Sequence, residues 1–321
     1  MTAANDAFRV DYDARLVEEA VMRALHGTRE EGAFRQERDR FYEIVEDGER
    51  EVSFRRLHAA WFVRLGLDCP VQQALDERPL LKTSVRRCAV TTARSKKDEG
   101  ADLFVAPAEE GRSEVDRRSV GVQVRPESLL EPDRLLGFLR HELLHVDDML
   151  DPRFGYEPSL PRSDAGPTHD RLLQDRYRAL WDAMIDGRLL KEGLVSASVR
   201  ERRLLDFARA FPMFGERTPE AFSRFFDQAA DTHDDLVAFA RDPEAFGDLV
   251  RVEHRGMRCP VCRFPTYGFE PDPERLPADV IALVREDFPD WHPARGICPQ
   301  CADLYRARPL SVSELALLPK A

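Results

Sequence analysis

The chain has 321 residues, a length that suggests about two domains. Its net charge of −11 at pH 7 argues against a general nucleic-acid binder and a polybasic membrane binder, because both need a cationic face. Hydrophobic residues make up 43% of the chain and charged residues 33%, so it has enough apolar material for a core and is too apolar for a disordered protein.

The location of the protein is indicated by what its sequence lacks. No stretch approaches the roughly 18 apolar residues of a transmembrane helix. Residues 1–20 are acidic and lack the apolar segment of a secretory signal. We therefore expect a soluble, cytoplasmic protein. In that setting, paired cysteines of the form Cys-x-x-Cys indicate a metal site rather than disulfides.

The N-terminal part of the chain, residues 11–80, is predicted to be mostly helical. Apolar residues recur at i, i+3 and i+4 from Leu16 to Leu25, which is the spacing of an amphipathic helix. A second helical stretch is expected from Phe54 to Leu65.

Three short strands and a long helix are expected next. Residues 84–91 and 102–106 are predicted to be short strands separated by a charged turn. Residues 119–125 alternate valine with glycine, glutamine and arginine, which predicts a half-buried strand. A helix over 132–150 follows, with a proline at its start and Asp-Pro at its end. Its apolar residues lie on nearly all sides, which predicts a buried helix.

The rest of the chain is expected to be a loop followed by helices. Residues 151–169 hold four prolines and two glycines and predict a long loop bordering a cleft. Helices are expected from about 170 to 190 and onward to about 246. The last segment, 251–308, carries the four paired cysteines.

The long helix contains the sequence His-Glu-x-x-His at residues 141–145. On an α-helix, residues i and i+4 lie about 5–6 Å apart on one face. His141 and His145 can therefore both reach one Zn²⁺ ion at roughly 2.0–2.1 Å. Glu142 lies beside them, where it can take a proton from a zinc-bound water.

This motif and its surroundings resemble the zincin metallopeptidases over roughly residues 84–190. Zincins have a β-sheet whose edge strand binds substrate, followed by an active-site helix that bears HExxH. The expected strand 119–125 before the helix fits this order. The resemblance implies that His141 and His145 are zinc ligands and that Glu142 is the general base.

A catalytic zinc site needs a third protein ligand and an open position. Asp182 and Asp186 have the spacing of the ExxxD pattern in the gluzincin branch, with Asp in place of Glu. There the first acid is the third ligand, and the residue four positions later holds a ligand histidine. The resemblance thus implies Asp182 as a ligand supported by Asp186. The alternative for Asp182 is a salt bridge with Arg178.

His169 and Asp151 are the other candidates for the third ligand. SprT-like proteases, a weaker match, combine HExxH, a later histidine and a C-terminal zinc ribbon in this order, which implies His169. Zincins with the pattern HExxHxxGxxD place an aspartate where Asp151 stands, although Asp148 replaces the glycine of that pattern.

The second motif consists of Cys259-Pro-Val-Cys262 and Cys298-Pro-Gln-Cys301, separated by 35 residues. Two such pairs predict a closed tetrahedral Cys₄ site, which is structural because no position stays open. The segment resembles a zinc ribbon with a helical insertion around 277–286. Its 251–306 stretch holds eight arginines and nine acidic residues, so a nucleic-acid role is not supported. A protein contact or a stabilising role is favoured for this segment.

These observations predict an α+β protein with mostly helical flanks. We expect a helical region over residues 1–80, a zincin-like core of small sheet and active-site helix with a helical continuation over 81–250, and a zinc ribbon over 251–321. The expected cofactors are one catalytic and one structural Zn²⁺.

The resemblance implies a zinc metallopeptidase that hydrolyses peptide bonds through a zinc-bound water activated by Glu142. Its partners would be a peptide or protein substrate and a protein bound by the ribbon, with no membrane and no nucleic acid. The alternative is a non-catalytic zinc-binding scaffold or adaptor. Glu142 favours the enzyme, because a scaffold needs no carboxylate beside the metal.

Overall fold

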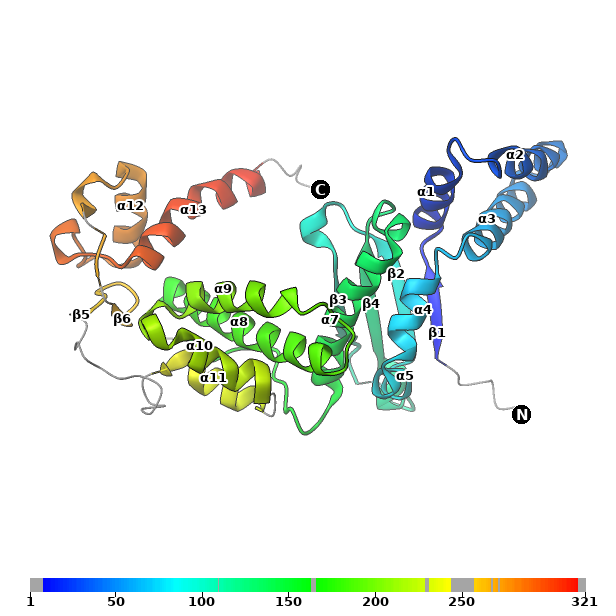
Figure 1. The fold of residues 1–321 in the computed structure, drawn as a ribbon. Coiled ribbons are helices and arrows are strands. Elements are labelled where there is room, and N and C mark those ends of the chain that lie inside the picture. Colours follow the sequence, from blue (N-terminus) through cyan, green and yellow to red (C-terminus); the bar gives the residue numbers. More distant parts are fainter. Residues whose placement is uncertain are drawn as a thin grey trace. The chain divides into compact units, whose positions relative to one another are not determined.

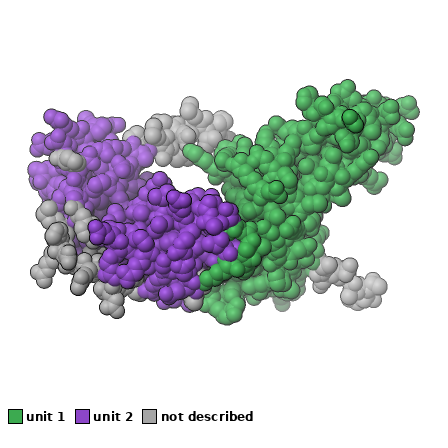
Figure 2. Space-filling view, in the orientation of Figure 1, with its two compact units in different colours: residues 1–156, 191–195 green, residues 157–190, 196–321 purple. Residues whose placement is uncertain are grey.

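The computed structural model describes most of the chain, in the ranges 8–108, 110–162, 166–228, 231–243, 257–266, 268–270 and 272–316. The chain forms two compact units, coloured green and purple in Figure 2 and treated separately here. Unit 1 comprises Met1–Tyr156 and Lys191–Val195, and unit 2 comprises Glu157–Leu190 and Ser196–Ala321. The predicted boundary at 250–251 lies outside the described residues, as do residues 163–165 of the predicted loop.

Unit 1 contains a mixed four-stranded sheet in the order β1-β2-β4-β3 (Figure 1). β2 (Arg87–Thr92) and β4 (Arg118–Val124) are parallel, and β3 (Gly100–Val105) pairs antiparallel with β4 at the edge of the sheet. These strands occupy the three predicted segments to within a few residues. In β4 the alternation is as predicted, because Val120, Val122 and Val124 are all buried.

The sheet has a fourth strand that the sequence analysis missed. β1 (Arg9–Tyr12) pairs in parallel with β2, with Val10 opposite Cys88. It is only four residues long, and its partner lies far along the chain, so no local pattern marks it. Asp13 then ends the strand and begins the next helix, because its carboxylate accepts hydrogen bonds from two backbone N–H groups of the first turn.

Helices make up most of the rest of the N-terminal region, as predicted. The five residues that follow the predicted helical spacing are all buried: Leu16, Val17, Ala20, Val21 and Leu25. The helices are α1 (Ala14–Leu25), α2 (Glu31–Asp39), α3 (Asp47–Arg64), α4 (Cys69–Asp76), α5 (Pro79–Ser84) and, between β3 and β4, α6 (Glu114–Arg117).

The helix that carries the histidine motif is α7 (Pro132–Leu150), which has the predicted bounds. It contributes Leu135, Leu139, Leu143, Val146 and Leu150 to the same core as the valines of β4. Each fully buried leucine stabilises the fold by about 1.5–3 kcal/mol. The orientation of the helix about its axis is therefore set by this apolar face.

Two polar contacts, one on each side of the motif, also hold α7 in unit 1. Arg140 donates to both carboxylate oxygens of Glu77, at 2.8 and 2.6 Å, and to the Leu194 carbonyl at 3.0 Å. The hydrogen bonds from Arg140 lower the pKa of Glu77, against the effect of burial. At the other end, Asp147 accepts from the Leu81 N–H in the first turn of α5 at 3.1 Å. The backbone that bears the histidines is thus fixed by charged groups as well as by packing.

Unit 2 begins with a set of helices around a phenylalanine-rich core. Gly187 in α8 allows close packing there, since a Cβ at this position would overlap the carbonyl oxygen of Phe226. The core contains Phe207, Phe211, Phe214, Phe222, Phe225, Phe226 and Phe239. The helices are α8 (Pro167–Lys191, whose last residue falls in unit 1), α9 (Ser198–Ala210), α10 (Thr218–Ser223), which continues into a π-helical turn at Arg224–Gln228, and α11 (His233–Arg241).

The described part of the cysteine-bearing segment of unit 2, from Met257 onward, holds a short β-ladder and two helices. β5 (Met257–Arg258) and β6 (Pro265–Thr266) form a two-residue antiparallel ladder. α12 (Ala278–Asp287) is the predicted helical insertion, and α13 (Pro299–Ala316) begins inside the second cysteine pair. The protein is therefore α+β with mostly helical flanks, as predicted. Among the described residues, no helix has the length and apolarity to cross a membrane.

Candidate functional site

The two histidines of the motif lie together on one face of α7. Their Nε2 atoms are 3.3 Å apart, and their ring planes meet at 78°. Two nitrogen ligands at 2.0–2.1 Å from a tetrahedral zinc ion are separated by about 3.3 Å. The same distance also fits a single N–H···N hydrogen bond. Both rings are half-buried, so the pair could hold an ion and still leave room for a substrate.

Glu142 lies next to these histidines and reaches the edge strand of the sheet. Its Oε2 atom accepts a hydrogen bond from the Ala101 N–H of β3 at 3.4 Å. The side chain is half-buried, like those of His141 and His145. A carboxylate held beside two imidazoles has the chemistry of a general base.

Asp182 and Asp186 belong to α8 and are described within unit 2. Arg203 of α9 joins them, donating to Asp182 at 2.9 Å and to Asp186 at 2.6 Å. Burial alone would lower the pKa of Arg203, but the attraction of the two carboxylates outweighs it and raises the pKa. The arginine that binds Asp182 is thus Arg203, whereas the alternative to a ligand role named Arg178. The two acids share one partner and form a fixed pair.

Asp151 ends α7 and is engaged locally. Its carboxylate accepts from the backbone N–H of Arg153 at 2.9 Å and from the Arg153 guanidinium at 2.7 to 3.1 Å. Its backbone N–H closes the last turn of α7 on the Asp147 carbonyl. These contacts end α7 at Asp151 and stabilise the turn that follows it.

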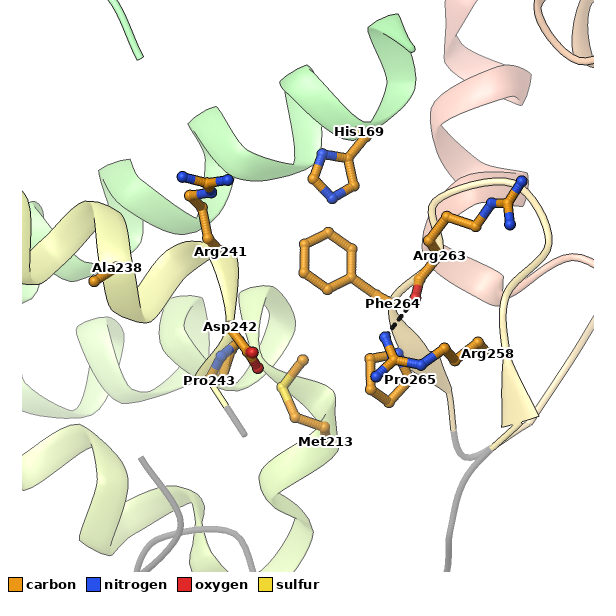
Figure 3. Close-up of a pocket in the computed structure, with 10 residues that line it drawn as sticks. All are labelled: His169, Met213, Ala238, Arg241, Asp242, Pro243, Arg258, Arg263, Phe264 and Pro265. Atoms are coloured by element: carbon orange, nitrogen blue, oxygen red, sulfur yellow. Dashed lines mark hydrogen bonds between the residues drawn. The ribbon is translucent and has the colours of Figure 1, made fainter. Parts of the chain in front are cut away.

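His169 lies against the cysteine-bearing segment. Its ring stacks on Phe264, with centroids 4.6 Å apart and planes 5° from parallel. It lines a cavity of about 630 Å³, and Figure 3 shows the side chains around this cavity. Asp242 is the one carboxylate among the described residues around this cavity, and its cationic residues are Arg241, Arg258 and Arg263. Burial and the charge of Arg176 lower the pKa of His169. The described residues around the cavity thus provide three cations against one carboxylate.

The four paired cysteines form a compact buried cluster, as predicted. Their sulfur atoms all lie within 4.8 Å of one another, and no side chain in the cluster is more than 5% exposed. The Sγ atoms of Cys262 and Cys298 are 3.9 Å apart. Thiolate ligands at about 2.3 Å from a tetrahedral zinc ion are separated by about 3.8 Å. None of the four is in a disulfide, and the cluster could hold a structural metal ion.

The backbone around the first cysteine pair forms a tight loop that presents both sulfur atoms. The Cys259 N–H bonds to the Phe264 carbonyl at 2.9 Å, and the Arg263 N–H bonds to the Cys259 carbonyl at 2.8 Å. Arg263 has a φ of 64°, in the left-handed region that rarely suits a side-chain-bearing residue. Backbone N–H groups also point at the sulfurs, since Cys298 N–H lies 3.4 Å from Cys259 Sγ and Cys301 N–H lies 3.4 Å from Cys298 Sγ.

The thiols influence one another strongly because they are so close. Hydrogen bonds from the neighbouring thiols lower the pKa of Cys259, whereas the corresponding contacts raise the pKa of Cys301. Four thiols at this distance cannot all ionise side by side. A divalent cation would remove the conflict, because coordinating thiols are deprotonated outright.

Comparisons with known proteins gave no match: no family model fits the sequence, and no curated protein or solved structure is significantly similar to it. The function must therefore be argued from the residues themselves. Two arginines near the candidate metal groups, Arg176 and Arg203, were not singled out by the sequence analysis. The chain contains 43 arginines, and no spacing distinguishes these two from the others.

Proposed function

We propose that the protein is a zinc-dependent metallopeptidase, with His141 and His145 as ligands of the catalytic ion and Glu142 as the general base. The observation that carries the proposal is the 3.3 Å separation of the two Nε2 atoms on α7, with a carboxylate one residue from the first histidine. When bound, zinc would supply Lewis acidity, polarising a peptide carbonyl and acidifying a water molecule.

Each residue of the motif has a separate task in this reaction. The two imidazoles provide neutral nitrogen donors on a helix that packing and the Arg140 and Asp147 contacts hold in place. Glu142 accepts the proton of the attacking water and later delivers it to the leaving amine. Its hydrogen bond to the Ala101 N–H orients the carboxylate without neutralising it, because a backbone donor carries no charge.

The edge of the sheet is the expected place for an extended substrate. β3 pairs with β4 on one side and is the last strand of the sheet. An edge strand can add a further chain through main-chain hydrogen bonds. Since Glu142 contacts the first residues of β3, a peptide lying along this strand would pass close to the general base. The substrate class is therefore a peptide or an unfolded stretch of protein.

Asp182 is the third ligand in this proposal. Arg203 fixes its carboxylate and also holds Asp186, and a ligand carboxylate is commonly oriented by such a partner. The two alternatives have other tasks, since His169 stacks on Phe264 and Asp151 binds Arg153. We further propose that the cysteine cluster binds a structural Zn²⁺, so the chain would hold two ions.

The test counts zinc per chain by native mass spectrometry and measures cleavage of labelled casein. We expect two ions in the wild type, one in His145→Ala, and two in Glu142→Gln with cleavage reduced at least 1,000-fold. A matched control is Glu131→Gln, which changes an exposed carboxylate at the start of the same helix and should leave both readings unchanged.

Two outcomes would contradict the proposal. One ion in both the wild type and His145→Ala, even after zinc is added, would assign all binding to the cysteines and favour the scaffold. Two ions with equal cleavage by the wild type and Glu142→Gln would remove Glu142 as the general base. Replacing Asp182, His169 and Asp151 singly by alanine identifies the third ligand, because only that variant should lose an ion.

A further inference from the structure

Arg176 is a fully buried arginine in α8 whose charge has no carboxylate partner among the described residues. Its side chain is 1% exposed. Its Nε atom donates to the Ala210 carbonyl at 3.2 Å, and its Nη1 atom has no hydrogen-bond partner. The guanidinium carbon lies 3.8 Å from the ring centre of Phe264, and this contact offsets only part of the desolvation.

An isolated buried cation is costly, because removing it from water costs several kcal/mol unless an opposite charge is near. The acidic groups that act on the charge of Arg176 are the thiols of Cys262, Cys298 and Cys301. Burial lowers the pKa of Arg176 to about 10, and these thiols oppose that shift. Four thiolates around a divalent ion carry a net charge of −2, which would attract the guanidinium in this buried medium of low polarity.

We propose that Arg176 is the counter-cation of the metal-loaded cysteine cluster and that this charge pairing fastens the cysteine-bearing segment to α8. The proposal rests on the structural ion inferred above and is independent of the peptidase activity. The buried guanidinium and the metal–thiolate group each carry an uncompensated charge alone. When they are paired, the +1 charge of Arg176 is fully offset and the −2 charge of the loaded cluster is halved. Metal binding and docking on α8 are therefore coupled.

The packing around Arg176 supports the attachment of the cysteine-bearing segment to α8. Phe264, which follows the first cysteine pair, lies between His169 and Arg176 and contacts both side chains. Leu172, between these two residues on α8, belongs to the same apolar cluster as the four cysteines. The first half of α8 is thus part of the core of the cysteine-bearing segment.

Two hydrogen bonds also join the cysteine-bearing segment to the helices of unit 2, one to α8 and one to α9. Thr168 on α8 donates to the Tyr305 hydroxyl at 2.6 Å in a buried contact. Gln300, inside the second cysteine pair, donates to the Arg209 carbonyl at 2.9 Å. This places both cysteine pairs against the helical part of unit 2: the first through Phe264 and the second through Gln300.

The test compares metal affinity with metal-free stability in Arg176→Met, which keeps an unbranched, flexible side chain of slightly smaller volume and removes the charge. Affinity is measured by Co²⁺ titration, followed through the thiolate-to-cobalt absorption that only the cysteine site gives, with competition by Zn²⁺. Replacing a residue that contacts the ligands but not the metal itself typically lowers metal affinity 10–100-fold. We expect a loss in this range for Arg176→Met, a loss of less than about threefold for Arg176→Lys, which keeps the cation, and no change for the exposed Arg171→Met.

In the metal-free protein, Arg176→Met should not lower the resistance to urea, although it lowers metal affinity. Without the metal, Arg176 has no metal–thiolate charge to pair with, whether the cysteine-bearing segment stays packed on α8 or detaches from it. Arg176→Met without metal should therefore resist urea at least as well as the metal-free wild type. This opposite sign separates a charge partner from a packing residue. Unchanged Co²⁺ and Zn²⁺ affinity in Arg176→Met would overturn the proposal, as would an equal loss of stability with and without metal.

Discussion

The histidine pair of α7 and the cysteine cluster are both spaced for a tetrahedral ion, yet their surroundings differ. The cysteine side chains are at most 5% exposed and lie in their own apolar cluster. The histidines and Glu142 are half-buried on a helix whose other face forms the core of unit 1. A closed set of four ligands suits a structural ion, and an open set suits chemistry.

The backbone under the two groups differs in the same way. The cysteines lie in turns next to a two-residue antiparallel β-ladder and at the start of α13. None of these elements is stable in isolation. α7 has 19 residues and packs on a sheet and two further helices. The first group should therefore need its ion in order to fold, whereas the second should remain folded when its ion is removed. Three substitutions test this contrast.

The largest effect is expected for Cys301→Ser, which removes a ligand with no solvent exposure. Metal binding at structural zinc sites is worth about 10–16 kcal/mol, and this energy is folding energy in such segments. We expect loss of one zinc ion per chain and loss of amide hydrogen-exchange protection over residues 257–308. The control is Cys69→Ser, at an exposed cysteine outside the cluster. Retained protection in Cys301→Ser would mean that the segment folds without its ion.

An intermediate effect is expected for Leu143→Ala, inside the motif but on the opposite face of α7. Leu143 is fully buried in the core of unit 1, and replacing a core leucine by alanine typically costs about 2–5 kcal/mol. The slowest-exchanging amides of β2 and β4 should report a loss of this size, with chelator present so that no ion contributes. A loss below about 1 kcal/mol would show that α7 does not complete the core.

The two regions also differ in how far the sequence could predict them. The bounds of α7 follow from Pro132 and from Asp151-Pro152, and the cysteine cluster follows from a spacing that few other structures require. β1 escaped prediction because its four residues are paired with a strand that begins at Arg87. Arg176 and Arg203, which lie near the candidate metal groups, could not be identified from the sequence, because their partners come from other parts of the chain. Long-range pairing leaves no local pattern in a sequence with 43 arginines.

The smallest effect on stability is expected for His145→Ala, although this variant should lose the ion that we propose for the histidine pair. Its ring lies on the half-buried face of α7, and the core beneath is closed by leucines that the substitution leaves in place. Alanine is also the best helix former, so the metal-free unfolding free energy of unit 1 should change by less than about 1 kcal/mol. The slow amides of β2 and β4 measured in chelator give this value, beside Leu143→Ala as the internal reference. If His145→Ala cost as much as Leu143→Ala, the histidine would be a structural part of the core. The contrast between an open ion site and a closed one would then fail, because both groups of ligands would be holding the fold together.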